Sequence, residues 1–177
     1  MDELLDIVNE QDRVIGQALR SACHGNPELI HRAVHVLVFN GRGRLLLQKR
    51  PLHKDVQPGR WDTSVGGHLD VGEGYYQGAL REMGEELGIV GRPLAFLYRY
   101  HYGNDVETEY VTSWWLRYDG LIPYNTDELD GVAFYAADEI DQMLGTGLLT
   151  PNFEQEWRLF KQWAGNRGGF DVLFSTG

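Results

Sequence analysis

The order of apolar and polar residues predicts several β-strands, most of them in antiparallel pairs. Apolar residues alternate with polar ones, or run together, in short segments that end at Gly, Asn or Asp, as strands bounded by turns do. An N-terminal hairpin is expected over about residues 1–20, and the turn Asn40-Gly-Arg-Gly43 predicts a second hairpin. The later strands are expected over residues 31–39, 45–48, 94–102, 107–118 and 132–136.

Helical periodicity is found in three other segments, which cover residues 74–87, 138–144 and 151–164. Thr150 and Pro151 stand where the last of these begins, and a capping hydroxyl followed by proline favours a helix start. No repeat or linker interrupts the chain, so residues 1–177 are expected to form a single domain. Antiparallel strand pairs that alternate with helices predict an α+β fold, in which a mixed sheet lies between helices.

Composition narrows the class of protein. The chain has 177 residues, of which 42% are hydrophobic, and a single cysteine, Cys23, so a scaffold held by internal disulfides is excluded. The N-terminus lacks the basic and apolar regions of a signal peptide, and the apolar runs are far shorter than the ~20 residues that span a bilayer. We therefore expect a soluble cytoplasmic protein with no membrane partner.

The charge balance disfavours a nucleic-acid partner. With 16 basic and 26 acidic residues the net charge is −10 at pH 7, whereas binding to a phosphate backbone needs clustered Lys and Arg. Glycine is in excess, with 22 residues, and many of them lie between Gly59 and Gly91 together with several carboxylates. A segment rich in both glycine and acid, within a folded domain, indicates a loop next to a metal site.

The most informative segment covers residues 67–89, which we call the box. It has the pattern G-x5-E-x7-R-E-U-x-E-E-x-G-U, where U is a bulky apolar residue, and every position is filled. On a helix, Glu82, Glu85 and Glu86 stand at positions i, i+3 and i+4, so their carboxylates gather on one face. Like charges at that spacing are unfavourable without a cation, and hard divalent cations prefer oxygen ligands. Glu73 lies one turn away, and Arg81 is expected to hold it.

This pattern resembles the signature of the Nudix hydrolase family. The resemblance implies an α/β/α sandwich that hydrolyses a small-molecule diphosphate with Mg2+ or Mn2+ as its cofactor. The metal ligands that it implies are Gly67, through its backbone carbonyl, Glu82, Glu85 and Glu86, and the catalytic set adds Arg81 and Glu73. Members of the family are often dimers, so a homodimer is a further expectation.

A second set of residues resembles one branch of that family, the isopentenyl-diphosphate isomerases. The set consists of His24, His31, His68, Glu107 and Glu109. In the isomerases such a set binds a divalent metal beside the diphosphate, and mixed His and carboxylate ligands suit Mn2+ or Zn2+. The same match assigns Arg50 and Lys54 to the diphosphate. The alternative is a polar cluster, left from a common ancestor, that binds substrate or water.

Two positions depart from the isomerases. Their reaction needs a cysteine thiol directly before the Gly-His of the matching loop, where this chain has Gly66, and they usually have Arg in place of Glu82. We therefore expect a hydrolase that cleaves the diphosphate linkage of a nucleoside diphosphate derivative or a related small molecule. Water would attack phosphorus, with Glu82 or Glu86 as the base. An isopentenyl-diphosphate isomerase and a non-catalytic binding module are the alternatives.

The sequence leaves several ring residues with two interpretations. The aromatic residues that either stack on a nucleobase or pack in the core are Tyr98, Tyr100, Tyr102, Trp114 and Trp115. His35 is expected to be a hydrogen-bonded core residue, whereas His53 and His101 are expected at the surface.

Overall fold

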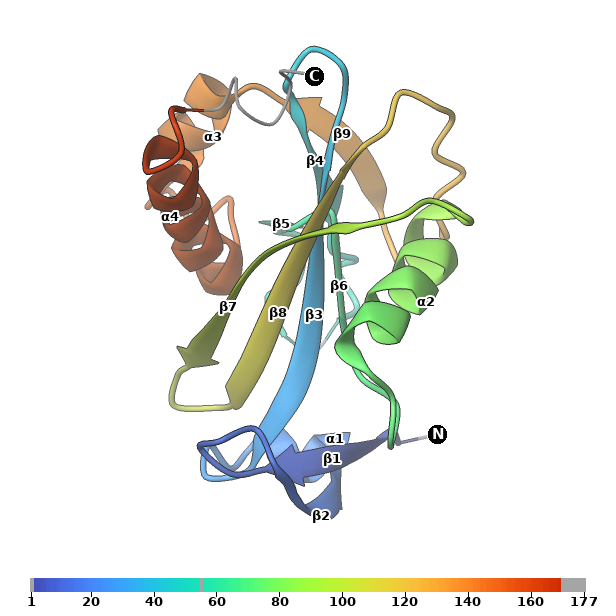
Figure 1. The fold of residues 1–177 in the computed structure, drawn as a ribbon, viewed down its shortest axis with the longest axis vertical. Helices are drawn as coiled ribbons and strands as arrows, with labels where there is room; N and C mark the ends of the chain where they lie inside the picture. Colours follow the sequence, from blue (N-terminus) through green and yellow to red (C-terminus); the bar gives the residue numbers. More distant parts are fainter. Residues whose placement is uncertain (1, 55, 170–177) are drawn as a thin grey trace. The chain divides into compact units, whose positions relative to one another are not determined.

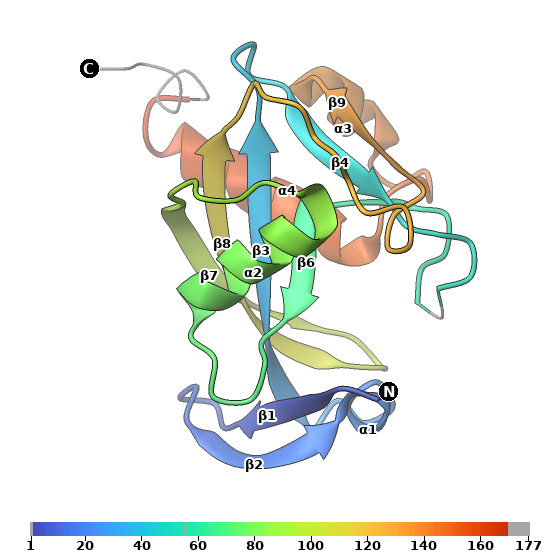
Figure 2. The same cartoon turned by 90° about the vertical axis from the view of Figure 1, so that its right-hand side faces the viewer.

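The computed structural model describes residues 2–54 and 56–169 (Figures 1 and 2). The chain forms two compact units that interleave along the sequence. The first unit comprises Met1–Val36 and Val65–Leu116, and the second comprises Leu37–Ser64 and Arg117–Gly177. The single domain expected for the whole chain stays a prediction.

The first unit contains most of the strands and the box. Its elements are β1 (Leu4–Val8), β2 (Val14–Leu19), α1 (Arg20–Cys23), the first part of β3 (Ile30–Phe39), β6 (Val65–His68), α2 (Tyr75–Leu87), β7 (Ala95–Gly103) and β8 (Thr108–Arg117). β3 pairs with β1, β6 and β8, while β1–β2 and β7–β8 are antiparallel pairs. The hairpin predicted within about residues 1–20 and the pairing of the strands predicted over residues 94–102 and 107–118 are therefore confirmed.

The register of β3 against β6 places the box loop. Ala33 lies opposite His68, and His35 lies opposite Gly66, in an antiparallel pair. β6 leads into α2, which packs against it (Figure 2). α2 ends at Gly88, whose φ of 66° is the left-handed conformation that suits a glycine cap.

Helical periodicity predicts an apolar stripe on α2 made of Tyr76, Leu80, Met83 and Leu87. The fully buried residues are instead Ala79, Met83 and Leu87, while Tyr76 and Leu80 are half-buried. The charged residues of the box lie on the remaining faces, where they are available for contacts outside the core.

The second unit is built around β4. Its elements are the end of β3, β4 (Leu45–Lys49), β5 (Trp61–Asp62), β9 (Gly131–Tyr135), α3 (Ala137–Met143) and α4 (Pro151–Gly165). β4 pairs with β3 through Phe39 and Leu45, which confirms the hairpin at Asn40, and also with β5 and β9. The predicted cap of α4 is present, because the Thr150 side chain accepts a hydrogen bond from the Phe153 N–H at 3.2 Å.

Three short elements were not predicted: α1, β5 and β6. The prediction that Gly66 and Gly67 lie in a loop is wrong, because both belong to β6, and the left-handed φ in this region is found at Gly72, with 76°. Residues 170–177, whose role the sequence left open, lie outside the described residues. Within the described ranges, none of the helices combines the length and the apolar character that crossing a membrane requires.

Candidate functional site

Arg81 is the central cation of the box. Its Nε and Nη2 donate to the two oxygens of Glu73, at 3.1 and 2.9 Å, which confirms the contact expected from the sequence. Nη2 also donates to the backbone carbonyl of His68 at 2.9 Å, so the guanidinium ties α2 to the end of β6. Hydrogen bonds from Arg81 hold the pKa of Glu73 below its ordinary value, although burial opposes this shift.

The same guanidinium reaches two of the three predicted metal ligands. Arg81 Nη1 donates to Glu82 at 2.8 Å and to Glu85 at 3.1 Å. Burial raises the pKa of Glu82, and the Arg81 charge only partly offsets it. Glu86 has a different contact, because its Oε2 accepts the Gly66 N–H at 3.2 Å.

Position 67 requires glycine, because the Glu82 carboxyl group lies very close to its backbone. A Cβ at this position would overlap the Glu82 carboxyl group, so any other residue would displace that side chain. Gly78 has a related reason, since a Cβ there would lie 3.1 Å from Glu73 Oε2 and 3.3 Å from Leu69. Both glycines therefore leave room for carboxylates of the box.

The donor chemistry of the box fits a hard divalent cation, but its carboxylates are not gathered around one point. Their oxygens and the Gly67 carbonyl are the ligands that Mg2+ prefers. Among the described residues, the side-chain groups close enough to share one ion do not include the box glutamates. A cation held there would replace the Arg81 guanidinium beside Glu82 and Glu85.

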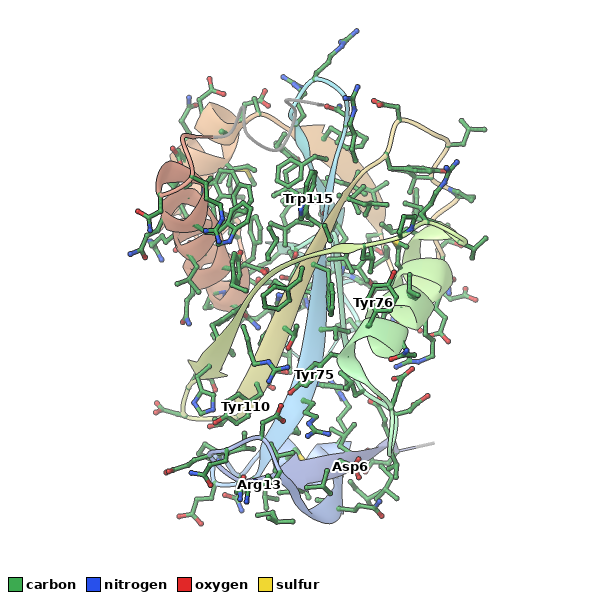
Figure 3. The ribbon with its side chains drawn as sticks, viewed as in Figure 1. Asp6, Arg13, Tyr75, Tyr76, Tyr110 and Trp115 are labelled. Carbon is green, nitrogen blue, oxygen red and sulfur yellow. The ribbon has the colours of Figure 1, made fainter. Side chains whose placement is uncertain are left out.

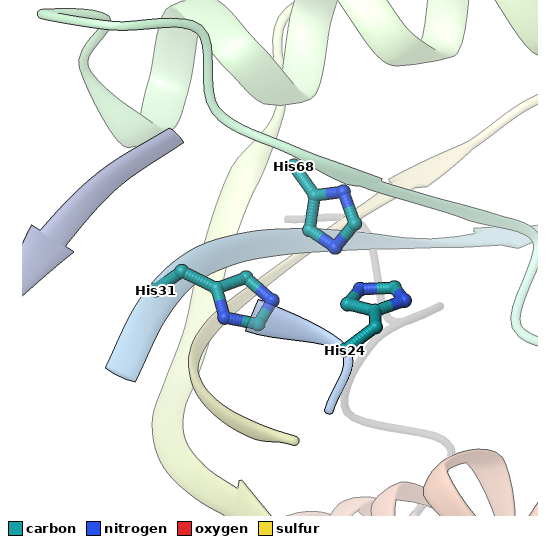
Figure 4. A group of neighbouring side chains, drawn as sticks. All are labelled: His24, His31 and His68. Carbon is teal, nitrogen blue, oxygen red and sulfur yellow. The ribbon is translucent and has the colours of Figure 1, made fainter. Parts of the chain in front are cut away.

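The second predicted set does form a compact cluster, which we call the histidine centre. Its residues are His24 after α1, His31 on β3, His68 on β6, Glu107 before β8 and Glu109 on β8. The three imidazole rings face one another, with centroids 5.0–5.7 Å apart (Figure 4). The cluster contains two overlapping groups, His24–His31–His68 and His31–Glu107–Glu109. Within each group, one ligand atom per residue lies within 4.8 Å of the other two.

The histidine centre brings carboxylate oxygens close to imidazole nitrogens. Glu109 Oε1 lies 3.4 Å from His68 Nε2 and 3.5 Å from His31 Nε2, and Glu107 lies 3.2 Å from His24 Nε2. Nevertheless, both ring nitrogens of His24 and Nε2 of His31 are buried without a hydrogen bond among the described residues. Buried polar atoms without partners are rare, and a shared metal ion would satisfy these.

Outer contacts orient two of the three rings. His31 Nδ1 lies 3.3 Å from the carbonyl oxygen of Leu29, and His68 Nδ1 lies 3.3 Å from Glu3 Oε2. Metal-bound histidines characteristically have such a carbonyl or carboxylate on the second nitrogen, which leaves Nε2 for the metal. The residues of the histidine centre therefore fit a divalent metal.

Burial and neighbouring charges shift the pKa values of several side chains in the histidine centre. Burial, together with the nearby Arg20 charge, lowers the pKa of His24 to about 4, so this ring is neutral near pH 7. Burial opposes the charged form of His68 too, but Glu109 and Glu3 raise its pKa to about 9. The pKa of Glu109 is well below its ordinary value, because its contacts with His31 and His68 outweigh its burial.

The two cations assigned to the diphosphate belong to the second unit and already have partners. Arg50 Nε donates to the Val56 carbonyl at 3.0 Å, and its Nη1 lies 3.4 Å from Asp62. Lys54 Nζ lies 2.7 Å from Glu128. Their role at the diphosphate stays a prediction.

The N-terminal hairpin contacts the box, which was not predicted from the sequence. Asp6 Oδ2 accepts the Gly72 N–H at 2.8 Å, and Asp12 Oδ1 accepts the Tyr75 hydroxyl at 3.0 Å. Tyr75 stands at the start of α2 (Figure 3) and lies 4.4 Å from the Arg99 guanidinium. The two hydrogen bonds join residues more than sixty positions apart, so no local pattern could reveal them.

Comparison with known proteins identifies the family. Residues 29–160 match the NUDIX domain. The Nudix hydrolase SCO1686 of Streptomyces coelicolor is 34% identical over 173 residues, which cover 94% of this chain and 93% of that protein. A Nudix hydrolase of Yersinia pestis is 34% identical over 169 residues, covering 88% of this chain and 90% of the relative. The crystal structure of DR0079 from Deinococcus radiodurans is similar with a TM-score of 0.75, at 26% identity, and covers 89% of this chain and 98% of that one.

The chain belongs to the Nudix family. More specifically, it is a Nudix pyrophosphohydrolase, whose general reaction is the cleavage of a diphosphate linkage. The predicted α+β fold, with a mixed sheet and helices, is confirmed by the similarity to solved Nudix structures.

Proposed function

We propose that this chain is a metal-dependent hydrolase that cleaves the diphosphate linkage of a nucleoside diphosphate derivative. The observation that carries the proposal is the position of the box carboxylates along β6. Glu82 lies against Gly67, and Glu86 accepts the N–H of Gly66. Acidic side chains therefore line one short stretch of backbone, where they can hold a cation against phosphate oxygens.

In this proposal Mg2+ or Mn2+ is held by Glu82, Glu85, Glu86 and the backbone carbonyl of Gly67. A bound ion of this kind would neutralise the charge of the diphosphate and of the leaving group. Arg81 remains bound to Glu73 through Nε and Nη2, while Nη1 releases Glu82 and Glu85. Arg81 thereby keeps α2 fixed to β6 while two ligands become available.

The proton of the attacking water goes to Glu82 or Glu86. Burial raises the pKa of Glu82, which makes its carboxylate a stronger base than an exposed one. Glu86 is held at Gly66 by a backbone hydrogen bond, which favours a fixed orientation. Both residues are also proposed ligands of the cation, so the two Gln variants are compared at a metal concentration that saturates each of them.

The histidine centre supports placement in the isomerase-like branch, with a second divalent metal such as Mn2+ or Zn2+. Arg50 and Lys54 are proposed to bind the more distant phosphate, for which each would exchange a carboxylate partner for a phosphate oxygen. A homodimer and a cytoplasmic location also stay predictions, and size-exclusion chromatography with light scattering tests the first.

Hydrolysis is favoured over isomerisation by the position of the one thiol. Cys23 is fully buried and packs with Leu5 and Ile7, and burial raises the pKa of its thiol. A buried, protonated thiol among apolar side chains is poorly suited to proton transfer. Gly66, at the position of the isomerase cysteine, supplies no side chain at all.

A substrate panel tests the proposal. The purified protein is incubated with Mg2+ or Mn2+ and with nucleoside diphosphates, nucleoside triphosphates, dinucleotides and isoprenoid diphosphates, and the products are separated by chromatography. We expect cleavage of a nucleoside substrate, reduced at saturating metal by about 10²–10⁴-fold in the variant, Glu82→Gln or Glu86→Gln, that removes the base. The control is Glu10→Gln, which changes an exposed glutamate in the β1–β2 turn.

Three outcomes separate the alternatives. No cleavage of any substrate by the wild-type protein contradicts the hydrolase. Interconversion of isopentenyl diphosphate isomers without release of phosphate supports the isomerase instead. Ligand-induced stabilisation without turnover, measured by thermal shift, indicates a binding module.

A further inference from the structure

The start of α2 depends on contacts with distant segments of the first unit. Its N-cap is Gly74, which makes no side-chain cap hydrogen bond in the described chain, and Gly72, two residues earlier, has a left-handed φ of 76°. A capping side chain normally accepts one of the free N–H groups of the first turn. Without such a cap, tertiary packing has to hold the first turn in place. The position of this turn matters, because α2 carries the box glutamates.

Tyr75, the first residue of α2, has three such contacts. Its hydroxyl donates to Asp12 Oδ1 at 3.0 Å. Burial and the charge of Asp12 raise the pKa of Tyr75 above its ordinary value, so the hydroxyl keeps its proton and remains a donor. The guanidinium groups of Arg99 and Arg32 lie 4.4 and 5.5 Å from the centre of the ring, which is within the range of cation–π contacts.

Asp12, in the turn between β1 and β2, joins these residues into one network. Its Oδ1 accepts Arg32 Nε at 2.7 Å, and its backbone carbonyl accepts Arg32 Nη2 at 2.6 Å. Its Oδ2 accepts Arg99 Nη1 at 3.0 Å. Hydrogen bonds between charged groups are stronger than those between neutral groups. One residue of the hairpin therefore ties the start of α2 to β3 and β7.

The backbone of Asp12 has an uncommon conformation. Its φ is 57°, in the left-handed region that residues other than glycine seldom adopt, although Asp and Asn tolerate it. The turn is closed by Asn9, whose carbonyl accepts the Asp12 N–H at 2.9 Å. Such conformations persist where the surrounding structure maintains them, and they are concentrated at functional sites.

Helical spacing relates Tyr75 to two glutamates of the box. With about 3.6 residues per turn, positions i, i+7 and i+11 lie along one side of a helix, and Tyr75, Glu82 and Glu86 occupy these positions. Glu82 lies against Gly67, and Glu86 accepts the Gly66 N–H. A rotation or shift of α2 at its first residue therefore moves both carboxylates relative to β6.

We propose that Asp12 is a positioning residue for the hydrolase, which holds Tyr75 and thereby places the box glutamates along β6. Asp12 acts through Tyr75 and not by contact with the substrate. This inference rests on the proposed function, because it takes Glu82 and Glu86 as ligands of the cation and as candidates for the base. Precise placement matters for such groups, since a displacement of about 1 Å can lower a rate by about 10²-fold.

Two variants break the contact in different ways. Asp12→Asn removes the charge, and asparagine tolerates the left-handed backbone of the turn. Tyr75→Phe removes only the hydroxyl and leaves the β1–β2 turn intact. The matched control is Tyr76→Phe, which removes the hydroxyl of the neighbouring half-buried tyrosine, where it accepts the Leu94 N–H at 3.4 Å.

Amide hydrogen exchange, measured by NMR, tests the placement without turnover. The Gly66 N–H donates to Glu86, so its exchange rate reports whether this carboxylate keeps its position. We expect the Gly66 amide to exchange about 10-fold faster in Asp12→Asn and in Tyr75→Phe, and at the wild-type rate in Tyr76→Phe. The Gly72 amide, which donates to another residue of the hairpin, is the internal reference and should keep its rate.

Steady-state kinetics tests the consequence for the reaction. The substrate is the nucleotide that the wild-type protein cleaves fastest, and Mg2+ is saturating. We expect kcat to fall by about 10- to 100-fold in Asp12→Asn and in Tyr75→Phe, with a much smaller change in KM, because the reacting groups are displaced and other substrate contacts remain. The double variant should be no slower than the slower single variant, since both changes break one contact. Tyr76→Phe should keep the wild-type kcat.

Four results would overturn the proposal: unchanged Gly66 exchange in both variants, equal acceleration at Gly66 and Gly72, an unchanged kcat in both variants, or independent losses of kcat that multiply in the double variant. Equal acceleration would mean that the whole hairpin detaches. Tyr75→Phe decides the matter where circular dichroism shows that Asp12→Asn fails to fold. Absence of cleavage by the wild-type protein, with faster Gly66 exchange in both variants, contradicts the proposed reaction and supports the placement of the glutamates by Asp12.

Discussion

The box and the histidine centre are both groups of carboxylates in the first unit, but their charges are balanced differently. In the box, the Arg81 guanidinium binds Glu73, Glu82 and Glu85. In the histidine centre, Glu107 and Glu109 contact imidazole rings, and ring nitrogens of His24 and His31 are buried without hydrogen bonds among the described residues. The two groups meet at His68, whose carbonyl accepts Arg81 and whose ring contacts Glu109.

This difference indicates how each group responds to metal. The guanidinium of Arg81 already neutralises part of the negative charge of the box glutamates. A divalent ion there therefore competes with Arg81, and substrate phosphates supply further ligands for the ion. The histidine centre already has its nitrogen and oxygen atoms assembled, so a metal ion needs little rearrangement to bind. We therefore expect the histidine centre to retain metal through purification and the box to exchange it freely.

The largest expected effect follows from removing the buried carboxylate of the histidine centre. Glu109→Gln leaves His31 and His68 without the charge that both contact, and removing one partner of a buried ion pair typically costs about 3–5 kcal/mol. Urea unfolding of the metal-free protein measures the free energy of unfolding, and elemental analysis of the purified variant measures the metal. The control is Glu85→Gln, because Glu85 is exposed.

The proposed difference between the box and the histidine centre would be contradicted if Glu109→Gln lowered the free energy of unfolding no more than Glu85→Gln does. Metal content equal to that of the wild-type protein would show that Glu109 is not needed as a ligand. Each result is informative without the other, because stability is measured in the absence of metal.

A smaller effect is expected at the cation of the box. Arg81→Gln removes the hydrogen bonds to Glu73 and to the His68 carbonyl, and it leaves Glu82 and Glu85 without a counter-charge. In metal-free buffer we expect the free energy of unfolding to fall by about 1–3 kcal/mol, because the box carboxylates and the His68 carbonyl lose their hydrogen-bond donor. Mg2+ should recover part of that loss in the variant, because the cation replaces the missing guanidinium.

Thermal unfolding with and without Mg2+ measures how far the ion replaces the missing guanidinium. Arg81→Lys is the comparison, because it keeps the charge but cannot bind Glu73 with two parallel hydrogen bonds. If Mg2+ stabilises the wild-type protein and Arg81→Gln equally, then the guanidinium and the cation do not compete for Glu82 and Glu85.

The sequence predicts those parts of the two groups that depend on local spacing. The turn at Asn40 predicts the hairpin of β3 and β4, and the cap at Thr150 predicts the start of α4. Both predictions succeed because these signals act within a few residues. The spacing of Glu82 and Glu86 placed them on one helix in the same way. The bounds of the main elements differ from the predictions by about one or two residues, as is usual for element ends.

What the sequence could not predict depends on register and on contacts between distant segments. The strand β6 was missed because Gly66 and Gly67 disfavour a strand locally, while pairing with β3 imposes one. That Arg81 spans Glu82 and Glu85 follows from rotamers that no spacing fixes. The contacts of Glu3 and Asp12 with the site depend on how the β1–β2 hairpin folds back on the box.

The smallest effect is expected one step away from the metal ligands, at Glu3. Its carboxylate lies 3.3 Å from His68 Nδ1, and the contact lowers the pKa of Glu3 below its ordinary value. Glu3→Gln keeps the size and removes the charge, so His68 loses an orienting partner but remains available through Nε2. Changes in such outer contacts typically weaken metal binding by about 10-fold or more.

Competition with a chromogenic chelator measures this affinity in the wild-type protein, in Glu3→Gln and in the control Glu10→Gln. The control matters because both residues belong to the N-terminal hairpin region, and only Glu3 contacts a ring of the histidine centre through its side chain. A weaker affinity in Glu3→Gln alone would show that the hairpin tunes the metal centre. An unchanged affinity would show that Glu109 and the burial of His68 are sufficient to orient the ring, and it would restrict the role of the hairpin to Asp6 and Asp12 at the box.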